Sequence, residues 1–98
     1  MTDKEILSNF IEAIELTPGV HSIVKKNDIN IDDDNKYEIS ILQDEKNKWN
    51  FRANIKILKN SNAKSIIEGI VSLTKFKLKK ASQKIGEVNI FIGGIAND

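Results

Sequence analysis

The feature that most constrains the fold is a short apolar run near the end of the chain, residues 88–92. It is the most apolar run in the sequence, and it is rich in the β-branched residues typical of buried strands. A strand turns nearly every residue inward only when both of its sides are covered. We therefore expect a buried strand around which the chain is organised, with Ile90 and Phe51 both largely buried.

A second segment, residues 49–58, has the clearest period of two. Apolar or small residues alternate with Asn50, Arg52, Asn54 and Lys56 throughout this segment. Such alternation predicts a strand with one packed face and one wet face.

Helical spacing of apolar residues predicts two helices. The first begins at Thr2, because Thr2 and Glu5 have the spacing of a capping box, and it ends before Pro18 and Gly19. The second runs from residue 63 to about residue 80, with Ser61 or Asn62 as its N-cap.

The remaining strands are predicted at residues 20–26, with an extension after a bend through 27–32, and at residues 36–43. Residues 32–35 form a polar turn between them. The order is α-β-β-β-α-β, and the final helix returns the last strand parallel to the third. We expect residues 1–98 to form one domain, an α+β two-layer sandwich with a mixed sheet and two helices on one face.

Composition excludes several functions. The 98 residues contain no cysteine, so disulfides, thiolate metal sites and cysteine nucleophiles are ruled out. The charged start of the chain has no apolar signal region, and no run approaches the roughly 18 apolar residues that would span a bilayer. We expect a soluble, cytoplasmic protein.

Three features could carry chemistry, but each has a simpler structural interpretation. Residues 28–32 begin like a calcium loop, but Asp33 replaces the required glycine and Ile39 the required glutamate. His21 is the sole histidine and stands in no recognisable catalytic arrangement. Gly93 and Gly94 lack the further glycines of a phosphate loop, so we expect a bulge or a close backbone approach there. We predict no catalytic residue, no metal site and no cofactor.

Charge divides the chain into two unlike halves. Residues 1–49 carry eleven Asp and Glu against six Lys, and residues 50–98 carry nine Lys and Arg against three acidic residues. A cluster near the end of the second helix is a candidate interaction patch: Lys75, Lys77, Lys79, Lys80 and Lys84. Cations there also complement the helix dipole, so the patch could be purely structural. We expect self-association in which the negative half of one copy meets the positive half of another.

The ordered set of these segments resembles the alkaline shock protein family, the Gls-type general-stress proteins of bacteria. Residues 10–20, FIEAIELTPGV, followed by His21, look like that family's opening helix and turn. Residues 49–58 look like its central strand, and residues 87–95 like its terminal Val-Asn-Val-x-Val-x-Gly-Val segment. The resemblance implies a cytoplasmic role in cell-envelope homeostasis, self-association, in some cases a membrane-anchor partner, and no catalytic residues.

We therefore expect a non-enzymatic scaffold or interaction module that does not itself span a membrane. The alternative is a KH-like RNA-binding module, since small α+β sandwiches with a basic helix include such domains. The sequence lacks the Gly-x-x-Gly loop of that class, and we expect no specific nucleic-acid binding. An orphan enzyme subunit is the last alternative.

Overall fold

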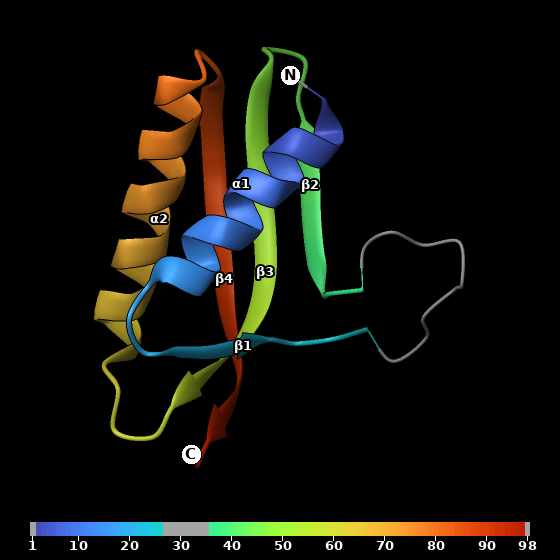
Figure 1. Cartoon of the computed structure of the whole chain (residues 1–98). Coiled ribbons are helices and arrows are strands. Elements are labelled where there is room, and N and C mark those ends of the chain that lie inside the picture. The colour runs from blue at the N-terminus through green and yellow to red at the C-terminus, as the bar shows by residue number, and fades with distance from the viewer. Residues whose placement is uncertain (1, 27–35, 98) are drawn as a thin grey trace.

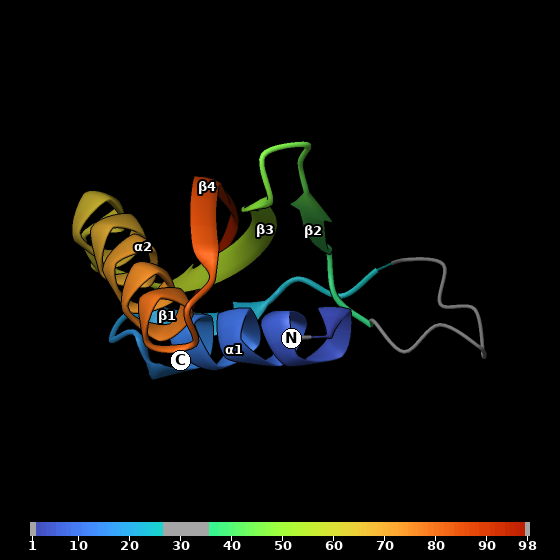
Figure 2. The same cartoon turned by 90° about the horizontal axis from the view of Figure 1, so that it is seen from above.

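The computed structural model of the chain describes residues 2–26 and 36–97. Within these residues two helices lie against one side of a four-stranded sheet (Figures 1 and 2). The elements are α1 (Asp3–Leu16), β1 (Val20–Ile23), β2 (Ile39–Gln43), β3 (Lys48–Leu58), α2 (Ala63–Lys80) and β4 (Lys84–Ala96). The predicted α+β class and the order α-β-β-β-α-β are confirmed. The turn predicted at 32–35 and the calcium-like stretch at 28–32 lie outside the described residues.

β3 is the centre of the sheet. β1 and β2 both pair with it antiparallel along one edge, β1 beside Ile55 and Ile57 and β2 beside residues 49–53. β4 runs parallel to β3 along the opposite edge, from Lys48 to Leu58. The sheet is therefore mixed, with the last strand parallel to the third as predicted.

The expectation that the last strand is buried and flanked on both sides is wrong. Among the described residues β4 pairs with β3 alone, so it is an edge strand. It extends over thirteen residues, and its exposed side chains include Phe91 and Ile95. Phe51 on β3 is buried as expected, whereas Ile90 on β4 is only half-buried. The apolar composition of β4 therefore reflects packing against α2 on one side, and not burial between two neighbouring strands.

The helices cover a single face of the sheet and close the core there (Figure 2). Every second residue of β3 from Trp49 to Ile57 points into this core and is buried, which confirms the predicted alternation. The rings of Phe10 on α1 and Phe51 on β3 have centroids 4.6 Å apart, a distance typical of favourable aromatic pairs. The apolar core cluster comprises Ile6, Phe10, Ile14, Ile23, Ile39, Trp49, Phe51, Ala53, Ile55, Ile57, Ile66, Ile70 and Leu78.

Capping side chains begin both helices. The Thr2 hydroxyl accepts a hydrogen bond from the Glu5 amide at 3.3 Å and starts α1 where the capping-box spacing predicted. The Asn62 side chain accepts from the Ser65 amide at 3.1 Å and starts α2. α1 ends one residue before its C-cap Thr17, just ahead of Pro18.

β1 and β2 are shorter than predicted because they share one edge of β3 and meet at Asn54. The Val24 amide donates to the Asn54 carbonyl at 2.9 Å, and the Asn54 amide donates to the Glu38 carbonyl at 3.1 Å. The Glu38 amide then donates to the Val24 carbonyl at 2.8 Å, so the two strands bond to each other where each leaves β3. One bridge further out joins Lys25 and Tyr37.

Candidate interaction surface

The sheet face opposite the helices carries no helix in either view of the molecule (Figures 1 and 2). We call it the open face. The alternation that buries one side of β3 turns Asn50, Arg52 and Asn54 toward it, as the sequence predicted for a wet face. The neighbouring strands add Ser40 and Leu42 from β2 and Asn89 and Phe91 from β4, which are in register with those β3 residues, and Glu87 from the bulge in β4.

Two large apolar side chains stand on the open face. Leu42 is 68% exposed and Phe91 is 51% exposed. The Arg52 guanidinium lies between their strands, 5.6 Å from the centroid of the Phe91 ring, within the range of a cation–π contact. The open face is thus an amphipathic surface in which a cation and an aromatic ring are already aligned.

Asn54 joins this face to the end of β4. Its Nδ2 donates to Glu38 Oε2 at 2.7 Å, while its buried Oδ1 accepts no hydrogen bond within the described residues. The Oδ1 points at Gly93, where an added Cβ would collide with it. The register between β3 and β4 shifts here, between Ile55 and Lys56, so the bulge predicted at the glycine pair is present.

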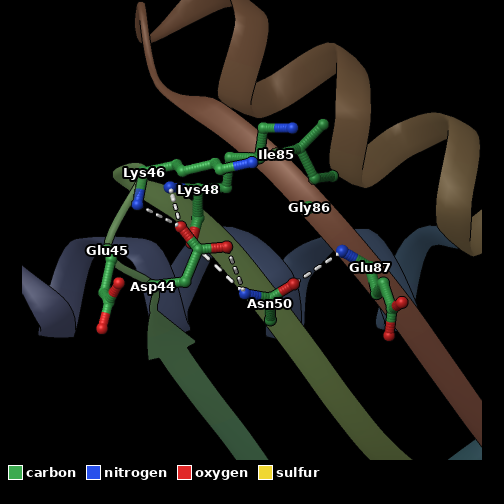
Figure 3. A pocket seen from close by; sticks show the side chains of 8 residues that line it. All are labelled: Asp44, Glu45, Lys46, Lys48, Asn50, Ile85, Gly86 and Glu87. Atoms are coloured by element: carbon green, nitrogen blue, oxygen red, sulfur yellow. Dashed lines mark hydrogen bonds between the residues drawn. The ribbon is translucent and has the colours of Figure 1, made fainter.

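A polar clamp holds the other end of the open face (Figure 3). Asp44 Oδ1 accepts from the amides of Lys46 and Lys48 at 2.9 and 3.0 Å, and its Oδ2 accepts from Asn50 Nδ2 at 3.2 Å. Asn50 Oδ1 in turn accepts from the Glu87 amide at 2.8 Å, which ties the β2–β3 turn to a second bulge in β4.

These bonds stabilise the charged form of Asp44. The hydrogen bond from the Lys48 amide, aided by Asn50 and the Lys46 amide and opposed by partial desolvation, holds the pKa of Asp44 below its ordinary value. The hollow beside the clamp has a volume of about 570 Å³. Because the polar groups of Asp44 and Asn50 bond to each other and to backbone, we interpret the clamp as structural.

The last part of β4 is an exposed apolar strip, which we define as residues 88–96. It contains no charged residue and no proline. Phe91 lies on the open face, while Ile92 and Ile95 pair with Ile55 and Ile57 yet remain 36% and 66% exposed. The strip combines unpaired strand backbone with exposed apolar side chains.

The structure splits the predicted lysine patch. Lys75, Lys79, Lys80 and Lys84 are exposed, and Phe76 is exposed among them. Lys77 instead turns toward α1 and forms an ion pair with Glu12 at 3.0 Å. This contact between the acidic and the basic half of the sequence is made inside a single chain, whereas the prediction was a contact between copies.

The other candidate residues lie apart from these surfaces. His21 is exposed on β1, with its Nδ1 2.9 Å from the hydroxyl of the adjacent Ser22. In the described part of the chain, no three His, Asp or Glu side chains gather in a way that could hold a metal ion. None of the helices there is long and apolar enough to cross a membrane.

Sequence reasoning missed the exposed strip as an interaction surface. The available signals were the lack of any charge between Glu87 and Asp98 and the paired glycines, which make a deeply packed strand less favourable. The sequence did not predict the role of Leu42 either, since a lone apolar residue next to a polar turn carries no periodic signal.

Together these features define a two-layer α+β domain with one uncovered sheet face and one long free strand edge. No family model and no curated protein matches the sequence. Among solved structures the chain is similar to the copper form of MamM CTD, with a TM-score of 0.65 and 12% identity over 94% of this chain and 85% of that one. It is also similar to a MamM CTD variant in a zinc form, with a TM-score of 0.63 and 12% identity over 97% of this chain and 85% of that one.

A further MamM-CTD variant gives a TM-score of 0.67 with 11% identity, over 95% of this chain and 98% of that one. At such identity these likenesses establish a shared fold across nearly the whole chain, and they leave the function to be argued from the surface.

Proposed function

We propose that the protein is a non-catalytic interaction module that binds protein partners, including copies of itself, through the uncovered face of its sheet and the free edge of β4. The observation that carries this proposal is the exposure of Leu42 and Phe91 on the open face and of Ile95 on the free strand β4. Burial of apolar area drives most protein association, and large exposed apolar groups rimmed by polar residues are typical of binding surfaces.

The polar groups of the same surface support recognition of a protein rather than turnover of a substrate. Asp44 and Asn50 are held by hydrogen bonds to backbone and to each other, and Asn54 by a hydrogen bond to the Glu38 carboxylate, which fixes the shape of the surface. Arginine and aromatic residues, here Arg52 and Phe91, are enriched where proteins meet.

The proposal is tested by comparing the wild type with a Leu42→Ser/Phe91→Ser variant as bait in a lysate of the source organism. We expect the wild type to retain itself or a defined partner and the double variant to lose it. Leu16→Ser is the matched control, because Leu16 is 60% exposed but lies on α1. A wild type that retains no more protein than the double variant would exclude the interaction module.

The alternative, a KH-like RNA-binding module, has less support. The exposed lysines around Phe76 could attract phosphates, but the sequence offers no Gly-x-x-Gly loop to clamp a nucleic-acid backbone. We predict only weak and strongly salt-dependent binding in a fluorescence titration against a mixed RNA pool. Submicromolar affinity that survives high salt would replace the interaction module with RNA binding.

The resemblance to alkaline shock proteins adds a proposed setting, cell-envelope homeostasis with a membrane-anchor partner. It rests on the sequence segments alone. Separate capture from the membrane and soluble fractions tests it, and a partner found only in the soluble fraction would argue against an anchor.

A further inference from the structure

We propose that residues 88–92 of β4 pair antiparallel with the same residues of a second copy, joining two sheets into one across a two-fold axis. This inference rests on the proposed interaction function and names its partner and its geometry. The pairing would be centred on Ile90, with Asn89 opposite the partner copy's Phe91 position and Val88 opposite its Ile92 position.

The outer edge of β4 is free. β4 pairs with β3 alone among the described residues, so the outward amides and carbonyls of β4 have no strand partner. Between the bulges at Gly86 and Gly93, residues 88–92 keep an unbroken register with β3, and this regular stretch can accept another strand.

The two edges of the sheet differ in how well they are protected against pairing. The β1–β2 edge consists of strands of four and five residues that are interrupted at Asn54, and short strands protect an edge against pairing. β4 has thirteen residues, and its segment 88–96 contains none of the charges or prolines that usually block edge pairing.

Charge does not oppose this pairing. Pairing centred on Ile90 sets the neutral residues 88–92 of one copy opposite the same neutral residues of the other. Outside this stretch, each charged residue faces a neutral one, with Glu87 opposite Gly93 and Lys84 opposite Ala96. The two Lys84 residues would then lie about 40 Å apart along the strands, at roughly 3.3 Å per residue. That separation is several Debye lengths at physiological salt, so the two Lys84 side chains would not repel each other strongly.

The proposed dimer would bury area from helices as well as from strands. Five paired residues alone bury less than the roughly 1,600 Å² of a standard interface. Both views show α2 on the side of β4 that faces away from β3, so a second copy paired with β4 would bring its own α2 against the first (Figures 1 and 2). Two helices and two strands would then meet across one isologous interface, which closes at the dimer.

Sedimentation of charge variants tests the pairing. Asn89→Lys/Phe91→Lys sets lysine opposite lysine on both sides of the axis, and like charges directly opposite destabilise strand pairs. We expect the dimer dissociation constant to rise at least tenfold, and likewise for Asn89→Glu/Phe91→Glu. An equimolar mixture of the two variants should restore dimers at low salt. Failure of the mixture to associate, or unchanged dimers in either variant alone, would overturn the inference.

A matched control carries the same charges on the same face but at the other edge. Ser40→Lys/Leu42→Lys alters two exposed residues of β2, two positions apart as in the test variant. This control should dimerise like the wild type, and circular dichroism should show that all the variants are folded. Loss of dimers in the control would place the interface on the open face and overturn edge pairing.

Oxidative cross-linking tests the register. Because the chain has no cysteine, Ile90→Cys supplies a single thiol that would face its own copy across the axis. Directly opposed antiparallel residues have Cα atoms about 4.5–5.5 Å apart, which a disulfide can join. We expect a cross-linked dimer for Ile90→Cys and none for the exposed control Leu42→Cys, and the reverse result would overturn the pairing.

The two proposals can fail separately. A wild type that stays monomeric at millimolar concentration overturns edge pairing between copies. If that monomer still retains another protein that the Leu42→Ser/Phe91→Ser variant loses, the interaction module stands with a different occupant. If it retains none, both proposals fail.

Discussion

Gly93 is a position where an added side chain would collide with a neighbouring residue, although no turn requires glycine there. A Cβ at this position would collide with Asn54 Oδ1, whose amide is anchored on Glu38 at its other end. At Gly94 the nearest atom to an added Cβ is Lys56 Cγ at 3.4 Å, in a flexible side chain. The two glycines therefore have different roles, which the sequence pair alone could not reveal.

We predict that Gly93→Ala lowers the free energy of unfolding by about 1–3 kcal/mol, the usual cost of overpacking. Gly94→Ala, the matched control, should cost less than about 0.5 kcal/mol, as ordinary surface substitutions do. Urea unfolding followed by circular dichroism measures both. Adding Asn54→Ala should recover most of the loss in the Gly93→Ala background, and a strictly additive double variant would exclude the proposed collision.

Asp44 gives a prediction about pH. Its pKa is lower in the folded chain than its ordinary value of 3.8, mainly through the Lys48 amide, so the folded state favours the charged form. The resulting stabilisation is complete well above pH 3.8 and is lost as the pH falls through 3.8 to the folded pKa. Asp44→Asn should therefore be less stable than the wild type at pH 7, and the difference should shrink below pH 4.

The same turn supplies the control for this experiment. Glu45→Gln removes a neighbouring carboxylate and should give no comparable change in the pH dependence of the urea midpoint. Parallel pH curves for the wild type and Asp44→Asn would mean that the clamp does not depend on the charge of Asp44.

At the scale of elements, most of the fold was predictable. The 3.6-residue period predicted α2 from residue 63 to about residue 80, with Ser61 or Asn62 as the cap, and the period of two predicted β3 within one residue. The neighbours of a strand were not predictable in the same way, because the apolar run of β4 fits both a central strand and an edge strand packed on a helix. Local periodicity reports which face is covered, whereas strand neighbours depend on contacts between distant segments.

The contrast between β3 and β4 predicts unequal costs of truncation. Phe51→Ala should lower the free energy of unfolding by about 3–5 kcal/mol, since Phe51 is only 2% exposed. Ile90→Ala should cost about 1–2 kcal/mol in the monomer, because burial of Ile90 is partial. Denaturant unfolding at low protein concentration measures both, and equal costs would mean that β4 is as deeply packed as β3.

At the scale of the whole molecule, the division of charge does not by itself determine how copies meet. The ion pair between Glu12 and Lys77 already joins the acidic helix to the basic helix within one chain. Salt should weaken the head-to-tail contact expected from charge but should change edge pairing little, so the two hypotheses can be separated. The sequence indicated the charges, but their partners emerged only from the packing of α1 on α2.

We predict that reversing Lys75, Lys79 and Lys80 to Glu leaves the dimer dissociation constant within about threefold of the wild type. These side chains are exposed, and interactions between exposed charges are screened over about 8 Å at physiological salt. Sedimentation across a salt series should likewise show little change. Strong weakening by salt or by the reversal would favour the head-to-tail contact.

The meeting of β1 and β2 at the edge of β3 has a consequence for how the chain can be lengthened. The Lys26 amide donates to the Lys36 carbonyl at 3.0 Å, so the segment between them leaves and rejoins the domain at one point. Loop closure costs little more for a long insert than for a short one, and inserts with adjacent ends disturb a fold least. We therefore expect a second domain inserted between Lys26 and Lys36 to leave β1 and β2 in place, because its two ends would be adjacent.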